Sequence, residues 1–384
     1  MQPFIQQANA FGAARKPFFF LIDFEQNQPI LLPLAECSSH QIFFQFPDYN
    51  NASCFDFNKP FEFSRTPLKF SRYQVAFELV KNEIQKGNSY LLNLAFATKI
   101  QTNYSLKEIF IKSHAKYKLF YQDKFICFSP ETFIRIKENK IFSYPMKGTI
   151  NASEENAKQK LLNSKKEFEE HNTIVDLIRN DLAIVSQNIR VTKYRYVEKI
   201  ETHHGAIYQT SSEICGELTE NWQANIGSIL AKLLPAGSIS GAPKEKTVQI
   251  IQQAEGEKRG YYTGIFGYFD GNNLESAVAI RYIEKNEQDE MLFRSGGGIT
   301  SQSSLEEELS NRGYDVHCDA VMVKDVNEDL IKGYDIFTPI AATDLGFEPG
   351  IPVIEAGPIL FRIPAMSAPV FDNIEAAIKE HGLS

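Results

Sequence analysis

The chain has 384 residues, enough for one large domain or two, and an ordinary globular composition. Its net charge is −8 with acidic and basic residues interspersed, which argues against nucleic acid as a partner. The five cysteines are scattered without a Cys-x-x-Cys pair, which argues against a disulfide framework and a zinc cluster. Because no signal segment or long apolar run is visible, we expect a cytoplasmic protein without membrane spans.

Runs of strands separated by helices are expected along the chain. The first half predicts strands at 17–22, 41–47, 90–98, 117–121, 125–128, 132–137 and 140–144, and helices at 72–86 and 105–115. Gly87 is expected to stop the helix at 72–86. The second half predicts helices at 153–185, 222–234 and 243–254, and strands at 261–269, 276–284 and 291–295. The expected buried stripe of the helix at 153–185 is Leu161, Phe168, Ile174, Leu177 and Ile178. This pattern predicts an α+β fold with largely antiparallel sheets.

Lys147 lies between a proline and a Gly-Thr pair, in Tyr144-Pro145-Met146-Lys147-Gly148-Thr149, which predicts a tight loop. If the ammonium lost hydration there, its pKa would fall and leave a neutral amine able to act as a nucleophile. An isolated Pro-x-Lys-Gly is more often a surface turn. The interpretation therefore depends on the motifs elsewhere in the chain.

Four other segments have the composition of a binding site. They are the charged helical run 170–182, the small-residue loop 235–244, the glycine-interrupted strand 259–268 with Ala279-Ile280-Arg281 after it, and the triple glycine at 296–298 followed by glutamates at 306–308. Small residues before a helix let backbone N–H groups approach an anion, and glycine in a strand marks close approach of a ligand. A triple glycine offers donors to a carboxylate, and clustered glutamates suit magnesium.

The order and spacing of these motifs over residues 60 to 308 resemble component I of the aminodeoxychorismate synthases, a branch of the chorismate-utilising family. The stretches that carry the resemblance are 87–90, 129–131, 145–149, 170–182, 237–244, 259–268 and 296–299. Lys147 is specific for this branch, since anthranilate synthases have alanine there. The resemblance implies two packed, largely antiparallel sheets flanked by helices, with a magnesium-dependent site between them.

The resemblance also implies roles for individual residues. Lys147 matches the amine that attacks ring carbon 2 of chorismate, Glu170 and Glu308 match magnesium ligands, and Thr149 and Lys244 match neighbouring site positions. The enolpyruvyl carboxylate is then held by Tyr262, Arg281 and the backbone of Gly296, Gly297 and Gly298. Ammonia would come from a separate glutamine amidotransferase subunit, because the chain has no glutaminase nucleophile motif. The product, 4-amino-4-deoxychorismate, leads to 4-aminobenzoate and folate.

Two positions depart from the family pattern. Gln209 stands where the family usually has a histidine near the leaving hydroxyl, and His203 and His204 are nearby in sequence. Asn311 stands where the family has a second glutamate on a C-terminal helix. An amide oxygen can coordinate magnesium but brings no charge, so metal affinity should fall.

The family resemblance ends at residue 309. We therefore expect a synthase domain over 1–309, divergent before residue 60, and a small α/β segment over 310–384. The second segment resembles the C-terminal part of a galactitol-type phosphotransferase IIB subunit, as a fusion or a frameshift would produce. It lacks that family's phosphoryl-accepting cysteine loop, so no phosphotransfer is assigned to it. The alternatives are an anthranilate or isochorismate synthase, or a synthase impaired by the replaced C-terminal helix.

Overall fold

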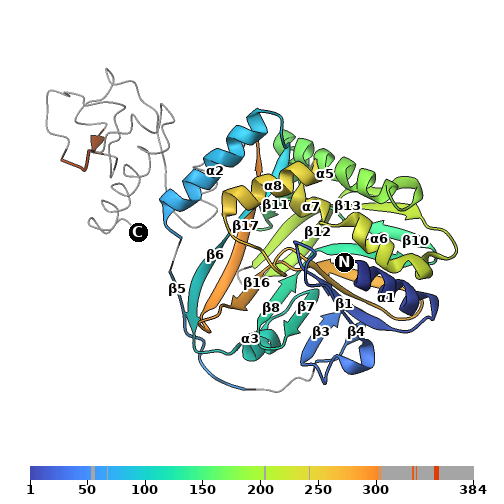
Figure 1. The fold of residues 1–384 in the computed structure, drawn as a ribbon. Coiled ribbons are helices and arrows are strands. Elements are labelled where there is room, and N and C mark those ends of the chain that lie inside the picture. The colour runs from blue at the N-terminus through green and yellow to red at the C-terminus, as the bar shows by residue number, and fades with distance from the viewer. Residues whose placement is uncertain are drawn as a thin grey trace.

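The computed structural model describes residues 1–52, 57–66, 68–202, 205–241, 243–301 and a few isolated positions beyond (Figure 1). His203, His204, Glu308 and Asn311 lie outside the described residues, as does most of the expected C-terminal segment 310–384.

The described residues form two antiparallel sheets, which confirms the expected fold class. The nine-stranded sheet contains β1 (Phe18–Ile22), β2 (Ile30–Pro33), β9 (Thr132–Lys137), β10 (Lys140–Ser143), β11 (Met146–Asn151), β12 (Gln187–Thr202), β13 (Gly205–Glu217), β14 (Ile265–Phe269) and β15 (Leu274–Val278). The eight-stranded sheet contains β3 (Ile42–Phe46), β4 (Tyr49–Asn50), β5 (Phe63–Thr66), β6 (Leu91–Thr102), β7 (Tyr117–Tyr121), β8 (Phe125–Ser129), β16 (Tyr282–Lys285) and β17 (Met291–Thr300).

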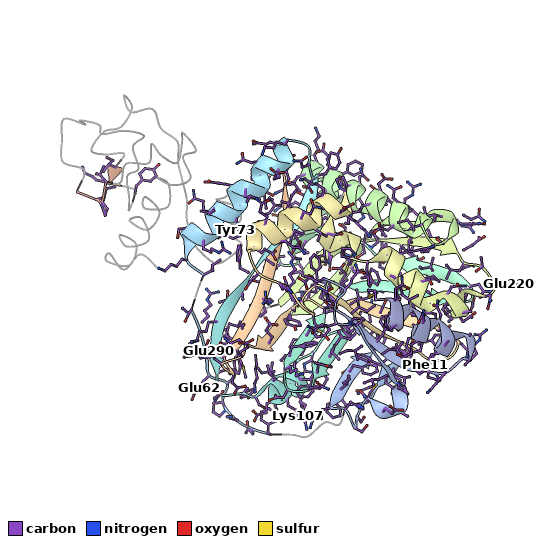
Figure 2. The ribbon with its side chains drawn as sticks, in the orientation of Figure 1. Phe11, Glu62, Tyr73, Lys107, Glu220 and Glu290 are labelled. Carbon is purple, nitrogen blue, oxygen red and sulfur yellow. The ribbon has the colours of Figure 1, made fainter. Side chains whose placement is uncertain are left out.

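Helices cover the outer faces of this pair of sheets. They are α1 (Gln2–Ala13), α2 (Phe70–Gln85), α3 (Leu106–Lys112), α4 (Ala157–Asn163), α5 (Lys165–Ala183), α6 (Ile226–Leu233), α7 (Gly237–Ser240) and α8 (Lys244–Glu255), with short 3-10 turns at Leu34–Glu36 and Trp222–Asn225. Figure 1 shows α2, α8, α7 and α5 in a row along one side of the sheets. Figure 2 shows Phe11 on α1, where its ring packs 6.0 Å from that of Phe18, and Tyr73 on α2, whose ring lies 5.9 Å from that of Phe96 on β6.

Strand β1 shows how the core is divided between the two layers. All five of its residues, Phe-Phe-Phe-Leu-Ile, are buried. Successive side chains of a strand point to opposite faces, so Phe18 and Phe20 join the cluster under the helices while Phe19 and Leu21 join the aromatic cluster between the sheets. A run of apolar residues without alternation is therefore expected for a strand covered on both faces.

Several expected boundaries are wrong, and each has a local cause. Lys147 lies on β11, not on a loop, because this segment pairs with β13 across a register shift. The helix expected at 153–185 is two helices, because Ser164 caps the start of α5 with its side chain. Phe168, expected in the buried stripe, is 43 % exposed. The strand expected at 276–284 divides into β15 and β16, which belong to different sheets.

Several elements were not expected from the sequence, among them helix α1 and the hairpin of β12 and β13. Helix α1 has no charged residue to mark a solvent face, and it is stabilised by contacts with α6 and with the 3-10 turn Trp222–Asn225. The long hairpin of β12 and β13 carries many charges on β12, because that strand pairs only with β13. Gly87 does end α2 as expected, with a positive φ of 78°.

A buried ion pair between Glu255 and Arg259 fastens the end of α8 to β6. The two side chains are 2 % and 1 % exposed, and Arg259 Nε donates to Glu255 Oε2 at 2.9 Å. Arg259 Nη2 also donates to the carbonyl of Asn93 at 2.6 Å, and the N–H of Ala95 donates to Glu255 Oε1 at 2.9 Å. Strand β5 pairs only with residues 99–102 of β6. The ion pair therefore provides hydrogen-bond partners for backbone groups of β6 that β5 does not reach.

Replacing Arg259 by Met is expected to lower the free energy of unfolding by about 3–5 kcal/mol, because Glu255 would be left as an unpaired buried charge. Urea denaturation followed by circular dichroism measures this. The matched control is Lys165→Met, which removes the exposed pair with Glu169 and should change the free energy by less than about 0.5 kcal/mol. Similar small losses in both variants would contradict the structural role of the buried pair.

Candidate active site

Lys147 reaches from β11 toward helix α5. Its Nζ lies 2.8 Å from Glu170 Oε2, and the two side chains are 28 % and 14 % exposed. The backbone carbonyl of Lys147 accepts a hydrogen bond from Thr210 on β13, which fixes the strand from which the side chain projects. The lysine is therefore partly exposed and paired with a carboxylate.

The amine of Lys147 also lies against β17 of the other sheet. A Cβ built on Gly298 would lie 3.5 Å from Lys147 Nζ, so the lack of a side chain at Gly298 leaves room for the amine. Three segments far apart in sequence thus meet at one point: β11, α5 and the triple glycine. The lysine and glycine motifs, which the sequence analysis singled out separately, thus lie together in the structure.

The glycine segment has backbone N–H groups on one edge that donate to no acceptor among the described residues. In the ladder of β17 with β6, Gly298 faces Asn93 and Gly296 faces Ala95. The Asn93 carbonyl and the Ala95 N–H bond to the ion pair of Arg259 and Glu255, on the side of β6 away from β17. In an antiparallel ladder, Gly298 with Asn93 and Gly296 with Ala95 are therefore the residue pairs without hydrogen bonds between their backbones. The N–H groups of Gly296 and Gly298 must then point away from β6. By the same alternation, the backbone of Gly297 pairs with β6.

The open edge of β17 lies where β16 ends. The first pair of β16 with β17 joins Tyr282 to Arg294, so β16 does not extend beside Gly296 and Gly298. Arg281 immediately precedes β16, has a positive φ of 53°, and its exposed side chain makes no hydrogen bond or ion pair within the described part of the chain. Free N–H groups beside an exposed guanidinium form a suitable site for a carboxylate.

Tyr262 is placed beside this edge by a strained turn. It is 3 % exposed and packs between the sheets, with its ring 5.8 Å from that of Tyr282. The next residue, Thr263, has a φ of 59°, which is rare for a β-branched residue and costs about 1–3 kcal/mol. Arg259 Nη1 donates to Thr263 Oγ1 at 3.1 Å, so the buried ion pair also holds this turn.

The other two expected substrate-binding residues are Thr149 and Lys244. Thr149 is exposed on β11 and faces Gln209 of β13, which places the glutamine that replaces the family histidine two residues along the strand from Lys147. Lys244 Nζ is bound by Asp181 Oδ2 at 2.9 Å and by the carbonyl of Leu233 at 2.8 Å. Burial raises the pKa of Asp181, and the charge of Lys244 opposes this. The ammonium of Lys244 therefore has internal partners here, and its contact with substrate stays a prediction.

A second carboxylate that the sequence analysis did not single out lies next to Glu170. Glu167 is one turn earlier on α5, and its Oε2 lies 2.6 Å from where a Cβ on Gly148 would be. Burial raises the pKa of Glu167, the charge of Glu170 raises it further, and Lys147 opposes both effects. The three-residue spacing of the two glutamates on a helix was the available signal.

These oxygen donors match the ligands that magnesium prefers. The charge of Glu170 raises the pKa of Glu167, and a cation beside these two carboxylates would stabilise both in their ionised form. Glu170 therefore fits the expected role of a magnesium ligand. No group of three or more His, Cys, Asp or Glu side chains with the geometry of a metal site occurs among the described residues. Glu308 and Asn311, the other expected ligands, lie outside them.

His171 follows Glu170 but points into the protein. It is fully buried, and its Nε2 lies 2.7 Å from Ser212 Oγ on β13. Burial lowers the pKa of His171 to about 4, so the ring is neutral at physiological pH. The histidine therefore ties α5 to the sheet that carries Lys147.

Comparison with known proteins identifies the family. Residues 36–310 match the family model of the chorismate binding enzymes. The chain belongs to this family. An uncharacterized PabA-like protein of Pasteurella multocida is 59 % identical over 310 residues, which cover 80 % of this chain and 95 % of that protein.

More distant relatives include synthases with different products. The aminodeoxychorismate synthase component 1 of Bacillus subtilis is 29 % identical over 252 residues, 62 % of this chain and 52 % of that protein. The anthranilate synthase component 1 of Aquifex aeolicus is 35 % identical over 198 residues, 49 % of this chain and 38 % of that protein. The solved structure of the menaquinone-specific isochorismate synthase MenF from Escherichia coli has the same fold, with a TM-score of 0.60 at 18 % identity over 81 % of this chain and 79 % of that one.

The family model ends within one residue of the expected domain boundary at 309, but the separate nature of residues 310–384 stays a prediction. Within the described part of this chorismate-binding chain, no helix is both long enough and apolar enough to cross a membrane.

Replacing Gly298 by Ala is expected to weaken chorismate binding at least tenfold while changing the free energy of unfolding by less than about 1 kcal/mol. The new methyl group would make only ordinary contacts, at 3.5 Å, but one of them is with the amine of Lys147. Chorismate titration followed by fluorescence, beside urea denaturation, measures both effects.

The matched variant is Gly296→Ala. Its methyl group would lie 2.6 Å from Asn93 Oδ1 and 2.8 Å from the Leu94 carbonyl, so it should lower the free energy of unfolding by about 1–3 kcal/mol. If Gly298→Ala binds chorismate normally, the amine and the glycine do not share a substrate site.

Proposed function

We propose that this chorismate-binding enzyme is an aminodeoxychorismate synthase component I, a transferase that converts chorismate and ammonia to 4-amino-4-deoxychorismate. The observation that carries the proposal is the position of Lys147 Nζ, which lies between Glu170 and Gly298 at the junction of the two sheets. An amine at this point can reach a ligand lying on the glycine segment. Anthranilate synthases have alanine in this place, so the lysine favours amination at carbon 4.

The reaction then proceeds in two displacements. Lys147 gives up a proton, and its amine forms a bond to ring carbon 2 while both ring double bonds shift and the 4-hydroxyl takes up that proton and leaves as water. Ammonia next bonds to carbon 4, both double bonds shift back, and the bond between Lys147 and carbon 2 breaks while the new ammonium gives a proton to the leaving amine. The lysine regains its proton, so no oxidant or reductant is needed.

Substrate carboxylates are recognised by separate groups. The enolpyruvyl carboxylate lies at the open edge of β17, where it accepts hydrogen bonds from Gly296 and Gly298 and pairs with Arg281, with Tyr262 alongside. The ring carboxylate would lie toward Glu170, where Glu170, Glu308 and Asn311 would hold a magnesium ion. When bound, the ion supplies Lewis-acid polarisation and offsets the double negative charge of chorismate.

Ammonia is supplied by a glutamine amidotransferase subunit in this proposal, since the chain has no glutaminase nucleophile motif. The product feeds 4-aminobenzoate and folate synthesis, and the site of action is the cytoplasm. These parts rest on the family resemblance.

The lysine mechanism predicts that purified chain forms 4-amino-4-deoxychorismate from chorismate, magnesium and ammonium salt, and that Lys147→Ala loses at least 10³-fold in rate. Coupling to an aminodeoxychorismate lyase reveals the product as 4-aminobenzoate. Without ammonium, intact-protein mass spectrometry should detect an adduct of chorismate minus water on the wild type and not on Lys147→Ala.

Lys165→Ala, at the exposed first residue of α5, is the control and should leave the rate unchanged. Anthranilate or isochorismate as the product would identify another chorismate enzyme. Turnover that survives in Lys147→Ala would exclude the covalent route.

The departure at Asn311 predicts weak magnesium binding. Asn311→Glu should lower the magnesium concentration for half-maximal rate at least tenfold, because it adds a charged ligand. Isothermal titration with magnesium in the absence of substrate gives the same comparison without turnover. An unchanged magnesium affinity would mean that residue 311 does not contact the ion.

A further inference from the structure

Asn93 on β6 lies over the glycine segment with unused hydrogen-bonding groups. Its Oδ1 is 2.6 Å from where a Cβ on Gly296 would be, is excluded from solvent, and has no hydrogen-bond partner in the part of the chain that the structure describes. Its amide nitrogen makes no hydrogen bond within the described residues. Asn93 was not among the residues singled out from the sequence.

The side chain of Asn93 shares a face of the sheet with the amine of Lys147. Asn93 is paired with Gly298 across the ladder, and opposite residues of two strands point to the same face. Gly296 and Gly298 are two residues apart, so their absent side chains would also point to that face, about 7 Å from each other. The Asn93 amide lies over Gly296 and the Lys147 amine over Gly298. A ligand bound on this face would lie between the Asn93 amide and the Lys147 amine or contact both groups.

Asn93 is held firmly in this place although its amide is unpaired. Its backbone carbonyl accepts from Arg259, whose ion pair with Glu255 is buried. A buried amide oxygen without a partner costs about 1–3 kcal/mol, and an apolar residue of similar shape would avoid that cost. An unpaired amide on a fixed strand beside a reactive amine is therefore suited to a ligand group.

We propose that Asn93 hydrogen-bonds to the uncharged polar substituent of the substrate ring, the 4-hydroxyl that nitrogen replaces. This inference rests on the proposed function. The two substrate carboxylates are charged and match Arg281 with the glycine N–H groups at one end and the magnesium ligands at the other. A hydroxyl or an amine both donates and accepts, and an amide supplies one group of each kind. Asn93 thus selects a ring that carries such a substituent.

The test compares two ligands in equilibrium binding, in a Lys147→Met background so that neither reacts. The ligands are chorismate and an analogue with hydrogen in place of the 4-hydroxyl. With Asn93 present, chorismate should bind at least tenfold more tightly than the analogue. Adding Asn93→Leu should remove this preference, because no group is left to recognise the hydroxyl. If it weakens both ligands by the same factor, Asn93 contacts another group and the inference is overturned.

The control is Gln101→Leu, which removes an exposed amide further along β6 and should leave the preference for chorismate intact. The thermal midpoint of Asn93→Leu should be unchanged or raised, since an unpaired amide is removed. A lowered midpoint together with an unchanged ligand preference would show a structural role and overturn the inference. If the chain with both Lys147 and Asn93 intact binds no chorismate, the proposed function is overturned instead.

Discussion

The buried ion pair of Glu255 and Arg259 is the interaction on which the site geometry depends. It takes the place of a neighbouring strand along the edge of β6, binding the carbonyl of Asn93 and the N–H of Ala95. Because the backbone groups of Asn93 and Ala95 point toward the ion pair, they do not bond to β17, and hydrogen-bonded and non-bonded residue pairs alternate from there along the ladder. The N–H groups of Gly296 and Gly298 consequently point away from β6. Two side chains at the edge of the sheet are thereby linked to which backbone donors face a ligand.

The second constraint is the crossing of the chain from one sheet to the other. Between β15 and β16 the chain leaves the nine-stranded sheet, passes Arg281 in a left-handed conformation, and joins the eight-stranded sheet. Thr263 has the same unusual conformation at the entry to β14. Strained residues persist only where surrounding packing fixes them, and here the aromatic cluster between the sheets and the hydrogen bond from Arg259 do so. The cost in stability lies next to the open edge that a carboxylate would occupy.

Charge compensation within the protein links the sheets and helices around this edge. Lys147 pairs with Glu170 and Lys244 with Asp181, each joining α5 to another element. Under the proposed function, the chorismate carboxylates would attract Lys147 and a magnesium ion would attract Glu170, so this ion pair would rearrange when both bind. The pair at Lys244 is more enclosed, because Asp181 also faces Gly237 at a distance too short for a side chain there. Helix α5 thus carries an enclosed ion pair at Asp181 and a more exposed one at Glu170.

The sequence by itself determined the fold class, the family, and the motifs that meet at the site, because these follow from local patterns of apolar residues, glycines and charges. Lys147, Glu170 and the triple glycine were all identified in this way and lie together. Only the tertiary structure decided that Lys147 is on a strand, that one expected strand divides between two sheets, and that Glu167 and Asn93 face the same region. Strand pairing joins residues far apart in the chain, so neither the register that exposes Gly296 and Gly298 nor the unpaired amide of Asn93 leaves a local signal.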